Sequence, residues 1–162
     1  MRDRIFLDTN ILVYSLLDND EPKHAQALKL MEALKGNYLF ISTQVVNELY
    51  VTLLKHGLEE KEVDARIKKV IEIYNIPFTT VLTLKTGWSI RKKYKLSYWD
   101  CIILASALES DCAIIYTEDM QDGLKVEGKL EVINPFTAGG RLKSSRLPAD
   151  QPSKPEKQYK SE

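Results

Sequence analysis

The sequence has 162 residues, which is enough for one domain with a sizeable core and a short extension. Hydrophobic residues make up 44% of the chain and charged residues 28%, which is a globular composition and excludes a disordered or fibrous protein. The net charge at pH 7 is zero, which argues against a protein that binds nucleic acid through overall positive charge.

Apolar runs, helix caps and turn residues alternate along the chain in a pattern typical of strands separated by helices. In chain order they predict a strand at 4–8, a helix at 11–17 capped by Asn10, a helix at 25–34 that Pro22 can start, a strand at 38–41, a helix from 43 to 57, a helix at 59–74, a strand at 76–81, a helix at 83–93, a helix at 97–108, and strands at 112–116 and 130–133. Strands joined through helices pair in parallel. The chain therefore predicts an α/β fold, a three-layer sandwich whose central, mostly parallel sheet of four to five strands has helices on both faces.

The pattern of strands and helices ends after Phe136. Residues 1–136 carry 17 Lys and Arg against 20 Asp and Glu, whereas residues 137–162 carry 6 against 3. Two glycines, three prolines and scattered Lys and Ser leave the second segment with little to pack. We therefore predict one domain at 1–136 and a flexible basic tail at 137–162. We interpret the tail as a solvated terminus, with binding of RNA or a partner as the alternative.

Membrane segments, a secretory signal and structural zinc are not expected. The longest apolar runs are too short to cross a bilayer, and the first four residues lead directly into a strand. Cys101 and Cys112 lie in apolar segments without CxxC spacing, and His24 and His56 are far from them in the sequence. This cysteine usage favours a reducing compartment, so we predict a cytoplasmic protein.

Several acidic residues lie where a parallel α/β sheet would place its functional site, beyond the carboxyl ends of the strands. Asp8 ends the first strand, and Glu48 lies early in the helix after the second. Asp119 follows the strand at 112–116, with Asp122 three residues later, and Asp100 lies in the first turn of the preceding helix. These side chains could converge at one edge.

Structural explanations exist for most of these acids. Ser97 and Asp100 have capping-box spacing, Asp119 could itself cap a helix, and Glu48 could lie on a solvated helix face. Asp8 is the hardest to explain structurally, since it ends an apolar strand with only Arg2 and Arg4 as nearby cations.

Together the acids predict a cation. Two carboxylates 4 Å apart repel by about 4 kcal/mol at an effective dielectric constant of 20. No lysine lies in any of these segments to offset that repulsion. Mg²⁺ or Mn²⁺ would do so, and carboxylate-held metals of this kind suit phosphodiester hydrolysis.

Four segments in order resemble the PIN-domain nucleases, and most closely their VapC-type toxin ribonucleases: FLDTNILV at 6–13, STQVVNEL at 42–49, YWDCIILASAL at 98–108 and YTEDMQDG at 116–123. The resemblance covers residues 1–135. It implies a metal-dependent endonuclease of single-stranded RNA that uses one or two Mg²⁺ or Mn²⁺ ions.

The resemblance also implies roles for individual residues. Asp8 and Asp100 would bind the metal directly, and Glu48 and Asp119 would complete the site directly or through water. Thr9, Asn10 and Thr117 would give polar support, and Asp122 is a fifth acid that competes with Asp119 for its role. Toxins of this branch form homodimers and bind a protein antitoxin, so both are expected here.

A cationic and aromatic segment precedes Asp100. Arg91, Lys92, Lys93 and Lys95 could hold phosphates, and Trp99 could stack an unpaired base. Alternatively, the cations complement a helix dipole and Trp99 joins the core.

The sequence lacks residues that two other enzyme classes require. A haloacid-dehalogenase-type phosphatase needs an aspartate where Asn10 stands, and a receiver domain needs adjacent acids and a late lysine that the sequence lacks. A non-catalytic PIN-fold RNA-binding or scaffolding protein remains the alternative, and metal binding would distinguish it from a nuclease.

Overall fold

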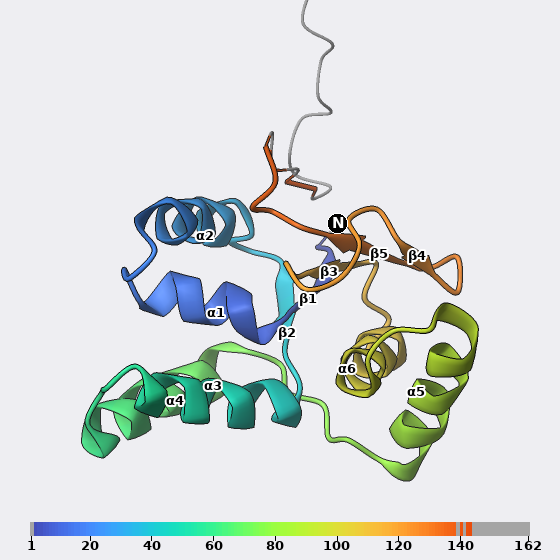
Figure 1. Cartoon of the computed structure of the whole chain (residues 1–162), viewed down its shortest axis with the longest axis horizontal. Coiled ribbons are helices and arrows are strands. Elements are labelled where there is room, and N and C mark those ends of the chain that lie inside the picture. Colours follow the sequence, from blue (N-terminus) through green and yellow to red (C-terminus); the bar gives the residue numbers. More distant parts are fainter. Residues whose placement is uncertain (1, 139, 141, 144–162) are drawn as a thin grey trace, which may run out of the picture.

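The structure, a computed structural model, describes residues 2–138, 140, 142 and 143, and its centre is a five-stranded sheet (Figure 1). The strands are β1 (Arg4–Leu7), β2 (Tyr38–Phe40), β3 (Ile114–Tyr116), β4 (Lys125–Val126) and β5 (Leu130–Ile133). Their order across the sheet is β2-β1-β3-β5-β4. All neighbours pair in parallel except β4, which runs antiparallel to β5. The first strand therefore lies inside the sheet, beside β3.

Six helices surround this sheet in the described part of the chain: α1 (Thr9–Leu16), α2 (Glu21–Ala33), α3 (Thr43–Lys55), α4 (Glu60–Ile73), α5 (Val81–Tyr94) and α6 (Tyr98–Glu109). They pack as the pairs α1 with α2, α3 with α4, and α5 with α6. The predicted fold class, an α/β fold with a mostly parallel sheet flanked by helices, is confirmed. None of the described helices combines the length and the apolarity that crossing a membrane requires.

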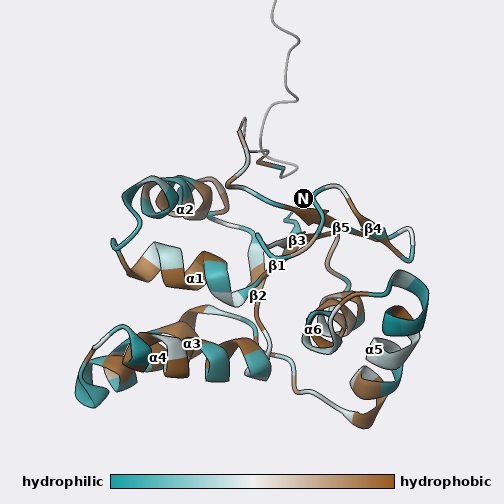
Figure 2. Cartoon of the chain, viewed as in Figure 1, coloured by the Kyte–Doolittle hydropathy of each residue, from teal (hydrophilic) through white to brown (hydrophobic). Residues whose placement is uncertain are grey.

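Hydrophobic patterning determines how deeply each helix is buried. The outer helices α2 and α4 carry both hydrophilic and hydrophobic residues, whereas the strands are mainly hydrophobic (Figure 2). Helix α6 has an unbroken buried run from Cys101 to Ala107, so it has no broad polar face and lies inside the molecule. Its amino-terminal turn is thereby held in place by the core.

Local side-chain bonds determine where most helices begin. Asp20 caps α2, which has a proline in its first turn as predicted, and Ser42 caps α3. Thr80 and Thr83 form a reciprocal capping box on α5, and Ser97 caps α6.

Three details of the predicted elements are wrong. Residues 76–80 form no strand; Asn75 makes a single bridge to Phe40, and Pro77 offers no backbone N–H for a ladder. The first helix starts at Thr9 rather than Ile11, because the carboxylate of Asp8, and not Asn10, caps it. The two-residue strand β4 was not predicted.

Lys143, which lies beyond Phe136, contacts the domain. The Tyr116 hydroxyl donates to the carbonyl of Lys143 at 2.9 Å and accepts from its backbone N–H at 2.8 Å. The Lys143 ammonium also pairs with Glu131 at 2.8 Å. The rest of the predicted tail, including residues 144–162, lies outside the described residues.

Candidate active site

Asp8 is the innermost acid of the candidate site. It follows β1 directly and caps α1, with Oδ1 accepting from the Thr9 backbone N–H at 2.7 Å. Its other oxygen, Oδ2, accepts from the Thr117 hydroxyl at 2.7 Å and from the Asn10 amide at 3.4 Å. Only 3% of Asp8 is exposed, so this carboxylate is held rigidly in a largely dry environment.

Asn10 and Thr117 link Asp8 to Asp119. The Asn10 amide nitrogen lies 3.3 Å from the Thr117 hydroxyl and donates to Asp119 Oδ2 at 2.9 Å. The backbone N–H of Asp119 donates to the Thr117 hydroxyl at 3.1 Å. Parallel pairing of β1 with β3 brings the ends of these strands together, so segments over 100 positions apart in sequence share one network.

Glu48 reaches the same place from the second turn of α3. Its Oε2 accepts from the Thr9 hydroxyl at 2.8 Å, and its Oε1 accepts from the Gln44 amide at 2.8 Å. Thr9 follows Asp8 in the chain, so its hydroxyl holds Glu48 beside the buried carboxylate.

Asp100 approaches from the first turn of α6. The Ser97 hydroxyl accepts from the Asp100 backbone N–H at 3.2 Å and donates to Asp100 Oδ2 at 2.6 Å. Ser97 therefore caps α6, but the reciprocal half of the expected capping box is replaced by this bond between the two side chains. This structural role leaves the second oxygen, Oδ1, without a hydrogen bond to any residue that the structure describes.

The four acids influence one another electrostatically. Burial raises the pKa of Asp8 to about 6, against the opposing effect of the hydrogen bonds from Thr117 and Thr9. The charges of Asp119 and Glu48 add smaller increases. Burial also raises the pKa of Asp100, again with contributions from Asp119 and Glu48. Among the described residues, no Lys or Arg forms an ion pair with any of the four. The result is a concentration of negative charge without a cationic partner in the described part of the chain.

The remaining predicted residues lie elsewhere or have other contacts. Asp122 accepts from the Asn134 backbone N–H at 3.0 Å, which ties the loop after β3 to the end of β5. It is therefore Asp119 that shares the hydrogen-bond network of Asp8.

The predicted RNA-binding cations lie on the far part of α5 and just beyond it. Arg91, Lys92 and Lys95 line a hollow with Trp88, separate from the groove that contains Glu48. Lys93 instead pairs with Glu127 at 3.1 Å, which raises the pKa of the Lys93 ammonium.

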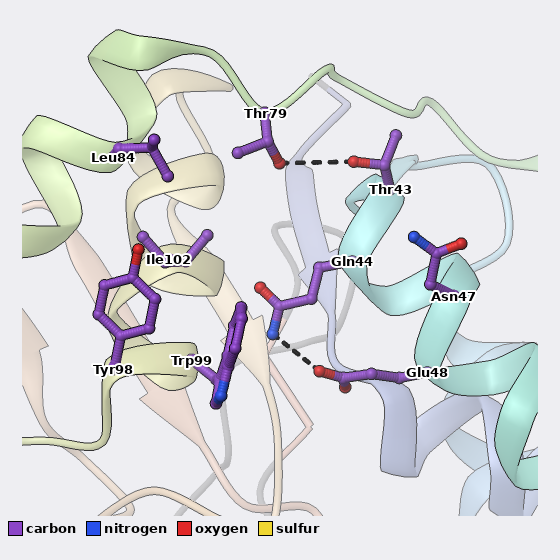
Figure 3. Close-up of a pocket in the computed structure, with 9 residues that line it drawn as sticks. All are labelled: Thr43, Gln44, Asn47, Glu48, Thr79, Leu84, Tyr98, Trp99 and Ile102. Carbon is purple, nitrogen blue, oxygen red and sulfur yellow. Dashed lines mark hydrogen bonds between the residues drawn. The ribbon is translucent and has the colours of Figure 1, made fainter.

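Trp99 lies beside the acids, in a groove of about 470 Å³ between α3 and α6 (Figure 3). Trp99 is 63% exposed, and its ring meets that of Tyr98 edge-on at 5.1 Å. The groove is lined by polar and apolar side chains: Thr43, Gln44, Asn47, Glu48, Thr79, Leu84, Tyr98, Trp99 and Ile102. The predicted alternative, in which Trp99 joins the core, is wrong.

The donor chemistry fits a hard cation. Every candidate ligand is a carboxylate, with hydroxyl and amide groups in support, and this set suits Mg²⁺ or Mn²⁺. As the side chains stand, however, no group of three or more His, Cys, Asp or Glu within the described residues is close enough to hold a metal ion. Bringing three of these acids onto one cation would therefore require movement of a side chain among Glu48, Asp100 and Asp119, all of which are at least partly exposed.

Two features of the site were not predicted. Gln44 holds Glu48 from one helical turn earlier, and the i,i+4 spacing in STQVVNEL is the signal that could have revealed it. The second is a cluster beside Asp119, in which Glu118 accepts from the Tyr14 hydroxyl and pairs with Lys23, each at 2.6 Å. No local sequence pattern indicates that second contact, because it joins residues 95 positions apart.

Comparison with known proteins identifies the family. A model of the PIN domain matches residues 5–122, which include all four acids. The chain belongs to the PIN domain family. No curated protein sequence matches it significantly.

Solved structures similar to this PIN domain share its fold. One is a toxin–antitoxin complex from Klebsiella pneumoniae, with 24% identity, a TM-score of 0.62, and coverage of 81% of this chain and 97% of that one. Another is the Mycobacterium tuberculosis toxin VapC20, described as cleaving the sarcin–ricin loop, with 18% identity, a TM-score of 0.58, and coverage of 68% and 86%. A third is VapBC2 from Rickettsia felis bound to a promoter DNA fragment, with 18% identity, a TM-score of 0.59, and coverage of 81% and 99%.

Proposed function

We propose that this PIN domain is a metal-dependent endonuclease that hydrolyses phosphodiester bonds in single-stranded RNA. The observation that carries the proposal is the cluster of Asp8, Glu48, Asp100 and Asp119, which share one electrostatic environment without a cationic partner among the described residues. Such a cluster is costly for the fold and chemically suited to a divalent cation.

Asp8 and Asp100 would hold the metal directly, and Glu48 and Asp119 would complete the site directly or through water. When bound, Mg²⁺ or Mn²⁺ would supply charge to stabilise the leaving oxygen and would lower the pKa of an attacking water.

Residues of this chain would orient the carboxylates. The Thr9 N–H and the Thr117 hydroxyl both donate to Asp8, so they favour its ionised form and fix its orientation. Asn10 donates to Asp119, and Thr9 donates to Glu48, so the two outer acids are held beside Asp8.

The chain is further proposed to be a VapC-type toxin, neutralised by a protein antitoxin, homodimeric and cytoplasmic. The support is the likeness in fold to solved toxin–antitoxin complexes. Co-expression of this chain with the product of the neighbouring gene tests the proposal. Recovery of an inactive complex is the expected result, and full activity with no complex would contradict an antitoxin.

The nuclease is tested by incubating single-stranded RNAs with wild type, Asp8→Asn and Asp100→Asn in Mn²⁺, Mg²⁺ or EDTA. Asp64→Asn, an exposed position on α4, is the matched control. We expect cleavage that needs metal, is lost in both site variants, and persists in the control. Cleavage in EDTA, or cleavage by Asp8→Asn equal to that of wild type, would contradict the proposed site.

A second candidate function is a PIN-fold RNA-binding or scaffolding protein without activity. It is favoured by the absence, in the described structure, of three acids already placed to hold a metal. Calorimetric titration with Mn²⁺, which measures metal binding, distinguishes the two candidate functions. Binding that Asp8→Asn abolishes supports the nuclease, and no binding by wild type supports the scaffold.

A further inference from the structure

The groove beside the acids contains a buried acceptor that no described residue satisfies. Gln44 Oε1 is shielded from solvent and has no hydrogen-bond partner among the residues that the structure describes. Buried polar atoms in folded proteins nearly always have a partner, so an orphaned one indicates a donor still to be supplied.

The orientation of the Gln44 amide follows from its neighbour. Glu48 Oε1 lies 2.8 Å from the Gln44 nitrogen, and an ionised carboxylate can only accept hydrogen bonds. The nitrogen must therefore face Glu48. The oxygen is turned away from Glu48, toward the space that Trp99 borders (Figure 3).

Trp99 forms the opposite wall of this space. Tyr98 packs against one side of the indole, and Gln44 and Glu48 lie on its other side (Figure 3). An indole that is 63% exposed, facing a buried amide acceptor across a groove of about 470 Å³, matches the needs of a flat, partly polar ligand.

We propose that this groove is a subsite for one unpaired nucleobase of the RNA substrate. The base stacks on the indole of Trp99. A rotation of the Gln44 side chain, which lines the groove, exposes Oε1 so that it accepts from an N–H group on the Watson–Crick edge of the base. Stacking on aromatic rings and hydrogen bonding of exposed base edges are how proteins bind single-stranded RNA. Gln44 and Trp99 would then determine which nucleotide is held next to the acids.

The subsite is joined to the acids through two direct links. Trp99 and Asp100 are consecutive residues in the first turn of α6, and Gln44 holds Glu48 on α3. The inference rests on the proposed function in assuming that single-stranded RNA is the ligand, but its test does not depend on cleavage.

The test measures binding of short single-stranded RNAs through tryptophan fluorescence. The sequence has two tryptophans, so a Trp88→Phe background isolates the signal of Trp99. Binding is measured in EDTA and, separately, in Mg²⁺ with Asp8→Asn added. For each of the four bases, an oligonucleotide is compared with one whose Watson–Crick N–H donor has been removed or methylated.

We expect RNA to quench Trp99 and the loss of the donor from the preferred base to weaken binding. Gln44→Ala should abolish that difference, whereas Gln26→Ala, an exposed glutamine on α2, should preserve it. In a chain that retains Trp88, with binding followed through a labelled RNA, Trp99→Leu should weaken binding about 5- to 100-fold. Trp88→Leu, tested in the same way, should have little effect.

Two results would overturn the subsite. One is the absence of Trp99 quenching by RNA under both conditions. The other is a donor effect that Gln44→Ala leaves intact for all four bases. RNA cleavage with no quenching of Trp99 would refute the subsite and leave the nuclease standing. Quenching of Trp99 by RNA in a wild type that binds no Mn²⁺ would support the subsite and refute the nuclease.

Discussion

Asp8→Asn should stabilise this protein while it abolishes activity. The change keeps the size and shape of the side chain and leaves an oxygen to accept from the Thr9 N–H. It removes a negative charge that is 97% buried and that lies near Asp119 and Glu48. The charge is required by the proposed chemistry but is unfavourable for folding.

The magnitude follows from the pKa of Asp8. A rise from the ordinary value of 3.8 to about 6 corresponds to about 3 kcal/mol. Between pH 4 and pH 6 the native state binds a proton at Asp8 that the unfolded state has released, so the free energy of unfolding falls as pH rises. At about pH 4 and below, Asp8 is neutral in the native state. Above pH 6 it is charged there, and the full cost applies.

Urea denaturation in EDTA, at pH values from 4 to 8, measures this effect. The stability of Asp8→Asn relative to wild type should increase from near zero at pH 4 to as much as about 3 kcal/mol at pH 8, less any loss from the second hydrogen bond. The exposed control Asp64→Asn should show no such trend. Equal stabilities at pH 8, or a difference that does not vary with pH, would refute the reasoning.

Metal provides the complementary measurement. Added Mg²⁺ or Mn²⁺ should stabilise wild type by about 2.7 kcal/mol at a concentration 100 times its dissociation constant. The same addition should leave Asp8→Asn almost unchanged. The stability advantage of the variant should therefore shrink or reverse once metal is present.

Three further predictions concern the framework of the site. A double-mutant cycle that removes Lys23, Glu118 or both, measured by urea denaturation, should give a coupling free energy of about 1 kcal/mol, because this 2.6 Å ion pair is partly buried. A coupling free energy near zero would contradict this prediction. Ser97→Ala should cost about 1 kcal/mol of unfolding free energy through loss of the α6 cap, whereas alanine at an exposed serine within α5 should cost little in the same assay. Tyr116→Phe should cost about 1–2 kcal/mol in the full chain, because its hydroxyl bonds twice to Lys143, but much less in a chain that ends at residue 136. Equal losses in both chains would show that this contact does not stabilise the domain.

Most of the fold could be predicted because its elements carry local signals. Apolar runs such as Ile114–Tyr116 and cap residues such as Ser42 and Ser97 can each be recognised from a few neighbouring residues in the sequence. The errors occur where that signal is weak. Residues 76–80 are apolar enough for a strand, but Pro77 and the Thr80 cap favour an extended connection into α5. The strand β4 has two residues and gains its hydrogen bonds only from β5.

Prediction of the site has a different limit. The position of each acid after a strand or in a first turn follows from parallel topology, so their approach to one edge could be anticipated. Which contacts each acid makes could not. The bond from Asn10 to Asp119 spans 109 positions, and the pair of Lys23 with Glu118 spans 95. Neither spacing has a periodic signature, since side chains that meet across a fold are arranged by its packing alone.

Helix α6 explains how catalysis and recognition can be coupled in the proposed enzyme. Its buried run from Cys101 to Ala107 leaves the helix little freedom to shift, and the Ser97 cap fixes where it begins. Trp99 and Asp100 are consecutive in that first turn, so one rigid element sets the position of both the indole and the carboxylate. A base stacked on Trp99 would bring its own backbone phosphates near Asp100. Because Gln44 also holds Glu48, changes at Gln44 should alter both which RNA is cut and how fast it is cut.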